Sequence, residues 1–311
     1  MRCKVTSKTQ KDQLTSLIGQ DFVEVQIQAF LNERKAQNLS KKTIKFYWDN
    51  LKPFLKYLED IEAKYISQIT PSIIRDYLLI LKDNEHTDGG VHCAYRSIKA
   101  FLNWYWDEVE PNFSNPIKKV KAPKVSIEPI EGISKEDFDS LVDACPKNKF
   151  YGERDRTILY ILLDTGVRAN ELCSINIEDI NLVDSSILIR QGKGRKPRFV
   201  FIGKKTRKQI RKWFRYRKSE TGALFINRQE ERIAYTTLRE LVRRLSLKAG
   251  LEKPPALHDF RRTFCLECLR KGIDLLTISR LMGHTSLQLL SRYAKQTSID
   301  LMNKYKSPLD D

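Results

Sequence analysis

Apolar and polar residues alternate with a helical period through the first hundred residues. Four stretches carry apolar side chains every three or four positions, as expected of amphipathic helices around one core. Ser40 and Thr70 are placed to cap the second and third helices, and Gly89-Gly90 precede the fourth. Pro53 either kinks the second helix or splits it. The pattern predicts a compact four-helix bundle over residues 21–109, after an N-terminal extension of residues 1–20.

Residues 110–131 interrupt this pattern with spaced prolines and lysines. Prolines disfavour helix and lysines disfavour burial, so we expect a basic linker. Ser134 and Asp137 then form a capping pair that opens a second domain, residues 132–311.

The second domain mixes helical and strand periods. Residues 157–163 are apolar and closed by charge on both sides, which indicates a buried helix. Residues 187–189 and 199–202 read as strands, and a Gly-Lys-Gly turn around Lys193 predicts a hairpin between them. The helical pattern then resumes, apart from short extended pieces near residues 224–227. The predicted fold is mainly α with a small β-sheet: a four-helix domain followed by an α+β domain.

The charge balance indicates a polyanion partner. Lys and Arg number 56 against 39 Asp and Glu, a formal charge of +17 over 311 residues, although basicity alone fits DNA, RNA and anionic lipid equally. Residues 1–20 are polar, and no run approaches the roughly 20 apolar residues that cross a bilayer. We therefore expect a cytoplasmic protein without a membrane partner.

Residues 190–218 concentrate this charge, with fourteen Lys or Arg and no Asp or Glu. The cationic side chains of such a run repel one another unless an anion lies between them, which favours nucleic-acid contact over a solvated face. The candidate DNA contacts in the linker and hairpin are Lys118, Lys119, Lys121, Lys124, Arg195, Lys196 and Arg198.

Six scattered cysteines give no disulfide framework. Cys265 and Cys268 form a C-x-x-C, but no second pair stands at ligand spacing, so packed thiols are favoured over zinc. The sequence holds no Walker loop, and we see no carboxylate cluster placed for a catalytic metal. We expect no cofactor.

Residue types suited to phosphodiester chemistry occur in the second domain. Attack on a phosphodiester builds charge on the non-bridging oxygens, and without a metal that charge needs fixed donors, of which guanidinium is the best. Arg168 follows Gly166 at a predicted helix start, whose dipole adds to its charge. Glu171, one turn later, is placed to hold a local arginine or a backbone amide.

Two histidines and a tyrosine extend this set. His258 and Arg261 are three residues apart, so on a helix they share one face and can reach one anion. Gly283 is placed to end a helix just before His284, and Tyr293 lies about two turns onward.

In order and spacing, these motifs resemble the tyrosine recombinase family, which includes phage integrases and Xer resolvases. The matching motifs are Gly-Val-Arg-x-x-Glu-Leu at Arg168, Gly-Lys-Gly at Lys193, His-x-x-Arg at His258 and Arg261, and Gly-His at His284 with Tyr293 nine residues later. Each motif is modest, and the ordered set is specific. The resemblance covers nearly the whole chain: the first domain is similar to the family's SAM-like core-binding domain and the second to its catalytic domain.

The resemblance implies catalytic roles. Tyr293 would form a 3′-phosphotyrosyl bond and release a 5′-hydroxyl; Tyr305, the other tyrosine after His284, lies too far from it. Lys193 would protonate the leaving oxygen, although Arg195 and Lys196 crowd the same turn. Arg168, Arg261 and His284 would bind the phosphate, and His258 would help accept the tyrosine proton.

The resemblance further implies a site-specific recombinase acting as a homotetramer on double-stranded DNA, with a C-terminal tail, about residues 294–311, that docks on a neighbour. A monomeric type IB topoisomerase and a catalytically silent DNA-binding regulator remain alternatives. The sequence does not choose among integrase, resolvase and invertase.

Overall fold

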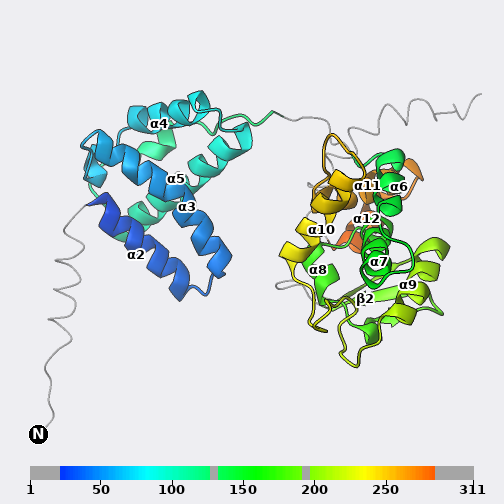
Figure 1. Cartoon of the computed structure of the whole chain (residues 1–311). Coiled ribbons are helices and arrows are strands. Elements are labelled where there is room, and N and C mark those ends of the chain that lie inside the picture. Colours follow the sequence, from blue (N-terminus) through cyan, green and yellow to red (C-terminus); the bar gives the residue numbers. More distant parts are fainter. Residues whose placement is uncertain (1–21, 127–131, 191–196, 284–311) are drawn as a thin grey trace, which may run out of the picture. The chain divides into compact units, whose positions relative to one another are not determined.

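The computed structural model describes residues 22–126, 132–190 and 197–283. The chain divides into two compact units, residues 1–127 and 128–311, and each unit has its own core (Figure 1).

The first unit is a bundle of the four predicted helices. Ser40 Oγ accepts the N–H of Thr43 at 3.1 Å, and Thr70 Oγ1 accepts that of Ile73 at 3.3 Å, so both predicted caps are confirmed. The elements are α2 (Val23–Ala36), α3 (Lys41–Asp60), η1 (Ile66–Gln68), α4 (Pro71–Asp83), α5 (Asp88–Val109) and η2 (Pro116–Lys119). Helix α3 runs unbroken through Pro53, which therefore does not split it.

The predicted linker begins later than expected. Ile117 and Val120 are 2% and 5% exposed in the core of the first unit, and Tyr95 donates to the carbonyl of Val120 at 3.1 Å. The 3-10 turn η2 buries Ile117 while Lys118 and Lys119 stay in solvent. The prediction of a linker from residue 110 was therefore wrong in its first half, because closely spaced lysines masked two buried apolar positions.

The second unit combines helices with a small sheet. Its elements are α6 (Lys135–Asp143), α7 (Phe150–Thr165), α8 (Ala169–Ser174), η3 (Ile177–Asp179), β1 (Ile180–Asn181), β2 (Ser186–Ile189), β3 (Arg198–Phe201), α9 (Lys204–Tyr216), α10 (Tyr235–Lys248), α11 (Leu257–Arg270) and α12 (Leu275–Met282). Ser134 caps α6 through the N–H of Asp137 at 3.0 Å, as predicted. The strands pair antiparallel in the order β1-β2-β3, with Ile187 opposite Val200.

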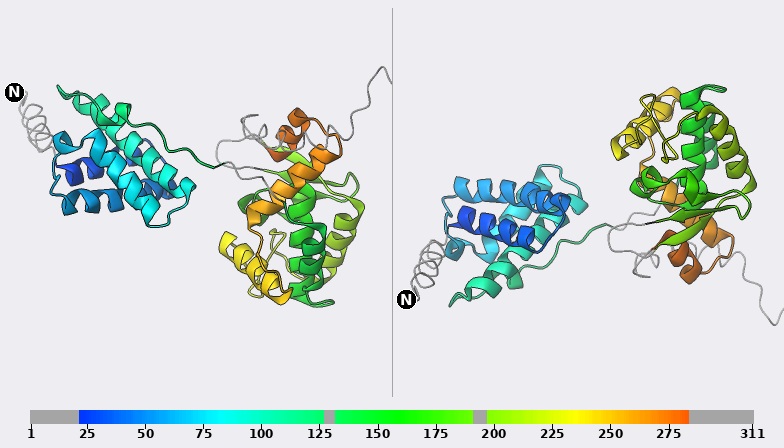
Figure 2. Two further views of the ribbon diagram at one scale, coloured as in Figure 1. Left: turned by 90° about the horizontal axis from the view of Figure 1, so that it is seen from above. Right: turned by 90° about the horizontal axis from the view of Figure 1, so that it is seen from below.

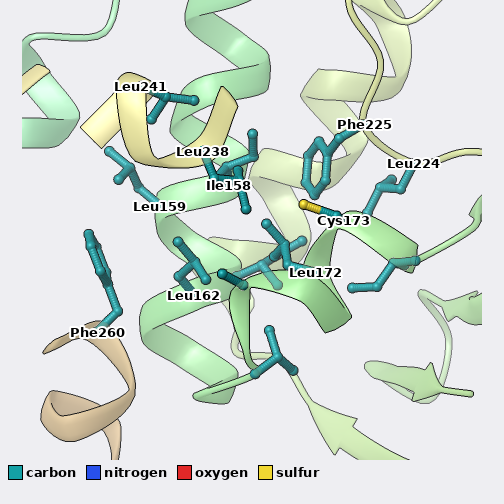
Figure 3. Packing of buried hydrophobic residues seen from close by; sticks show 14 of the residues in the cluster. Ile158, Leu159, Leu162, Leu172, Cys173, Leu224, Phe225, Leu238, Leu241 and Phe260 are labelled. Atoms are coloured by element: carbon teal, nitrogen blue, oxygen red, sulfur yellow. The ribbon is translucent and has the colours of Figure 1, made fainter. Parts of the chain in front are cut away.

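The core of the second unit surrounds α7, which packs against α9 and α11. Figure 3 shows Ile158 and Leu162 of α7 among Leu172 of α8, Leu238 of α10 and Phe225. Helix α12 lies beside β3 at one side of this unit (Figure 2). Hydrogen bonds bring the ends of α7 and α12 together with the starts of α8 and α11.

Acidic residues of other elements neutralise part of the basic run. Arg190 pairs with Asp179 and Glu178, and Lys212 pairs with the buried Glu153 at 2.9 Å. The exposed cations on α9 are Lys204, Lys205, Lys208, Arg211 and Arg215. The run therefore finds some of its counter-anions within the fold, and DNA contact stays a prediction for the exposed cations.

The two C-x-x-C thiols are packed, as expected. Cys265 is fully buried and Cys268 is 7% exposed, in a cluster with Ile278 and Met282. Burial raises the pKa of Cys265 to about 12, so its thiol stays protonated. Within the described residues, no group of three or more His, Cys, Asp or Glu is arranged to hold a metal, and no described helix is long and apolar enough to span a bilayer.

Candidate active site

Arg168 is held at the turn between α7 and α8. Gly166 ends α7 with φ +60, a left-handed conformation that favours glycine. Glu171 then accepts the backbone N–H of Arg168 and its Nη1, both at 2.9 Å. Glu171 thus fulfils both roles predicted for it, holding an arginine and a backbone amide.

Arg261 joins two helix ends from within the core. Its side chain leaves α11 just after the first turn of that helix and is 2% exposed. Nη1 donates to the carbonyl of Gly166 and Nη2 to that of Met282, each at 2.6 Å. Arg261 therefore fixes the end of α7 against the end of α12.

Arg168 reaches the same end of α12. Its Nη1 donates to the carbonyl of Met282 and its Nη2 to that of Gly283, both at 3.3 Å. The C-terminal carbonyls of a helix carry its negative dipole end, which offsets the repulsion between the two guanidiniums. The side chain of Arg168 is 32% exposed, so it is the more accessible of the two to a phosphate.

Glu171 is shared between two arginines. Arg198 donates to it through Nη2 at 2.7 Å and Nη1 at 3.1 Å, while the Glu171 side chain is only 4% exposed. Burial alone would raise the pKa of Glu171, but hydrogen bonds from Arg198 and the Arg168 N–H, with the charges of both arginines, lower it to about 2. This carboxylate is ionised at any physiological pH.

Gly283 ends α12 with φ +59, which confirms the predicted helix stop. A Cβ at this position would lie 3.0 Å from both Cζ and Nη1 of Arg198. Glycine is thus required by the backbone conformation and by the arginine that passes over it.

His258 stands in the first turn of α11, three residues before Arg261, and remains exposed. Loss of hydration where the ring packs on the protein, followed by the charges of Arg262 and Arg261, lowers the pKa of His258, against the opposing effect of Asp259. Arg168 also lowers this pKa. A neutral imidazole, able to accept a proton, is therefore favoured near the arginine pair.

The structure brings together three of the predicted catalytic residues: Arg168, Arg261 and His258. The predicted residues that lie outside the described ranges are Lys193, Arg195, Lys196, His284, Tyr293 and Tyr305. The linker lysines at 118, 119, 121 and 124 are exposed on the first unit. Arg198, which we grouped with DNA contacts, is instead 12% exposed and paired with Glu171, an arrangement that favours a supporting role within the site.

Comparison with known proteins agrees with this geometry. Residues 131–298 match the phage integrase family, and residues 26–108 match the phage integrase N-terminal SAM-like domain. A tyrosine recombinase XerC from Thermodesulfovibrio yellowstonii is 30% identical over 284 residues, covering 88% of this chain and 91% of that relative. A tyrosine recombinase XerA from Pyrococcus furiosus is 26% identical, covering 88% and 90%.

Solved structures share the fold. A lambda integrase dimer bound to a core site superposes with a TM-score of 0.74 at 16% identity, covering 88% of this chain and 96% of that one. XerH bound to its difH substrate gives 0.71 at 20% identity, covering 87% and 81%. The chain therefore belongs to the phage integrase family and is a site-specific tyrosine recombinase of the Xer-like type.

Proposed function

We propose that this chain cuts and rejoins DNA strands at specific sites through a 3′-phosphotyrosyl intermediate on Tyr293. The observation that carries the proposal is the pair Arg168 and Arg261, gathered at the end of α12. His284 follows that end directly in the sequence, and Tyr293 comes nine residues later.

The arginine pair suits a phosphoryl transfer. As the phenol oxygen of Tyr293 bonds to phosphorus, negative charge grows on the non-bridging oxygens, where Arg168 donates directly and Arg261 adds charge from behind. His284 donates a further hydrogen bond. Pre-arranged donors such as these are more effective than water, because they need no reorganisation during the reaction.

Two residues move the protons. His258 accepts the phenol proton of Tyr293, in keeping with its lowered pKa. Lys193 protonates the 5′ oxygen as its bond to phosphorus breaks. The new phosphotyrosyl ester replaces the broken diester, so attack by a 5′-hydroxyl reverses the step and reseals a strand without ATP.

The DNA partner would be double-stranded, with two duplexes held by a homotetramer. The net charge of +17 supports a polyanion partner. The exposed lysines at 118, 119, 121 and 124 and the hairpin cations Arg195 and Lys196 would contact phosphates. Among structural neighbours, a lambda integrase tetramer is bound to a Holliday junction, and the same assembly is our proposal for this chain.

A suicide duplex with a nick near the cleavage site tests the chemistry, because the short fragment that carries the released 5′-hydroxyl diffuses away and the covalent adduct stays trapped. Candidate sites would first be recovered as DNA bound to this chain in cells. We expect an adduct on a denaturing gel that Tyr293→Phe abolishes and Tyr305→Phe retains. An adduct that survives Tyr293→Phe would refute the nucleophile. Joints between two labelled sites would distinguish recombination from topoisomerase activity.

A further inference from the structure

Three segments of the second unit meet at the guanidinium of Arg198. Its Nη1 and Nη2 grip both oxygens of Glu171 in α8, and its Nε donates to the carbonyl of Leu281 in α12 at 2.8 Å. The side chain itself begins on β3 and is 12% exposed. One planar group thus ties a strand to the ends of two helices.

We propose that Arg198 is a positioning residue for strand cleavage, which orients Arg168 through their shared carboxylate and fixes β3 to the end of α12. The inference rests on the proposed function, since the reaction that Arg198 supports is the transfer to Tyr293. Arg198 itself would not touch the phosphate, because its fork is directed at Glu171.

The argument begins with Glu171. Arg198 binds both carboxylate oxygens, a two-point contact that sets the plane of the carboxylate. Arg168 then meets that carboxylate twice, through its backbone N–H and through Nη1. Without Arg198 the carboxylate can rotate and pair with Arg168 alone, and the guanidinium of Arg168 loses its fixed direction toward the end of α12.

The second step concerns the hairpin. Arg198 follows Lys193 by five residues, and Leu281 precedes His284 by three. The bond from Arg198 Nε to the Leu281 carbonyl therefore joins the two segments that lead to the proposed proton donor and the proposed phosphate ligand. A misplacement of about 1 Å at such groups lowers a rate by around 100-fold.

Lysine cannot replace this arrangement. An ammonium is a compact charge without the planar fork, so it can pair with Glu171 but cannot bind both oxygens and the Leu281 carbonyl together. Gly283 supports this reading, because a side chain there would press on the Arg198 guanidinium.

The test measures binding and chemistry separately. For Arg198→Gln and Arg198→Lys, single-turnover cleavage of the suicide duplex is followed across DNA concentration. We expect the saturating cleavage rate to fall about tenfold or more, with Lys recovering only part of it, while the Kd for DNA changes by less than about threefold. Glu171→Gln should give a similar loss, and the double variant Arg198→Gln/Glu171→Gln should be no slower than the worse single variant.

Arg190→Gln is the matched control. Arg190 directly follows β2, whose last residue Ile189 pairs with Arg198, and it also pairs with carboxylates, but those of Asp179 and Glu178; its side chain is 54% exposed. The Arg190→Gln variant should cleave the suicide duplex at the same rate as the unaltered chain. Thermal unfolding of each variant checks folding, and the lysine variant serves where the glutamine variant does not fold.

The outcomes separate the two proposals. Normal saturating rates for both Arg198 variants, or a loss confined to DNA affinity, would overturn the positioning role and leave Tyr293 chemistry intact. No adduct from the unaltered chain would instead overturn the proposed function.

Discussion

Arg168 and Arg261 donate hydrogen bonds to one and the same atom, the carbonyl oxygen of Met282, at 3.3 and 2.6 Å. Two cations that share an acceptor repel each other, and this repulsion must be offset by negative charge close by. Here it comes from the end of α12 and from Glu171, which is paired with Arg168 at 2.9 Å. The pair is therefore assembled by the fold before any phosphate arrives.

Arg168→Lys should slow cleavage by about 10²–10³-fold at saturating DNA, because an ammonium cannot replace the directed donors of a guanidinium in the transition state. The rate of adduct formation on the suicide duplex measures this. Arg239→Lys is the control: Arg239 is an arginine on α10 with a side chain 71% exposed. Equal slowing in both variants would contradict a specific role for Arg168.

The acid limb of the cleavage rate should respond to Arg262. Because its pKa is lowered, His258 stays neutral at pH values somewhat below the ordinary pKa of histidine. Activity should therefore persist at those pH values. Arg262→Gln removes a cation that lowers this pKa and releases Asp259, whose charge raises it. Both effects raise the pKa of His258, so the acid limb should move to higher pH, with little change at alkaline pH.

Arg270→Gln serves as the control for this pH profile. It removes the same charge from the same helix, but Arg270 pairs with Glu267 far from the first turn. Its acid limb should match that of the unaltered chain. If the acid limb of the cleavage rate does not shift in Arg262→Gln, or shifts equally in both variants, His258 is not the titrating group.

Gly166→Ala should destabilise the second unit more than Gly250→Ala. Both glycines have positive φ, which costs alanine about 1–2 kcal/mol. At Gly166 a Cβ would also lie 2.8 Å from Cγ of Phe264, whereas at Gly250 nothing lies within 4 Å. We expect about 1–3 kcal/mol of additional loss from overpacking at Gly166, measured by urea unfolding. Equal losses would mean that Phe264 moves aside freely.

Ile117→Ala should destabilise the first unit by about 2–5 kcal/mol, because it empties a buried position. Ile61→Ala, at a side chain 42% exposed, should cost far less. Three of the four tryptophans, Trp48, Trp104 and Trp106, lie in this unit, so tryptophan fluorescence reports mainly its unfolding; the fourth, Trp213, lies in the second unit. If Ile117→Ala unfolds like the unaltered chain, the segment after residue 110 does not belong to the core.

What could be predicted from the sequence was local. The caps at Ser40, Thr70 and Ser134 and the stop at Gly283 depend on residues three or four positions away, so a short motif suffices. The two-residue strand β1 is too short to give a pattern of its own.

The contacts that hold the arginines of the site in place could not be predicted from such short motifs. Arg261 is anchored on backbone carbonyls of Gly166 and Met282, and a carbonyl leaves no signature in the side chains. Arg198 meets Glu171 across 27 residues. Its place in a basic run suggested a DNA contact, and only the folded sheet shows that it turns inward.

The depressed pKa of Glu171 has a consequence for how this enzyme senses its surroundings. A carboxylate that stays ionised down to about pH 2, between guanidiniums that never lose their protons, makes the electrostatic frame of the site independent of acidity. Among the described groups of the site, His258, with its lowered pKa, is then the one left to respond to acidity. Acidification below this lowered pKa should accordingly silence proton transfer while leaving the anion-binding frame assembled.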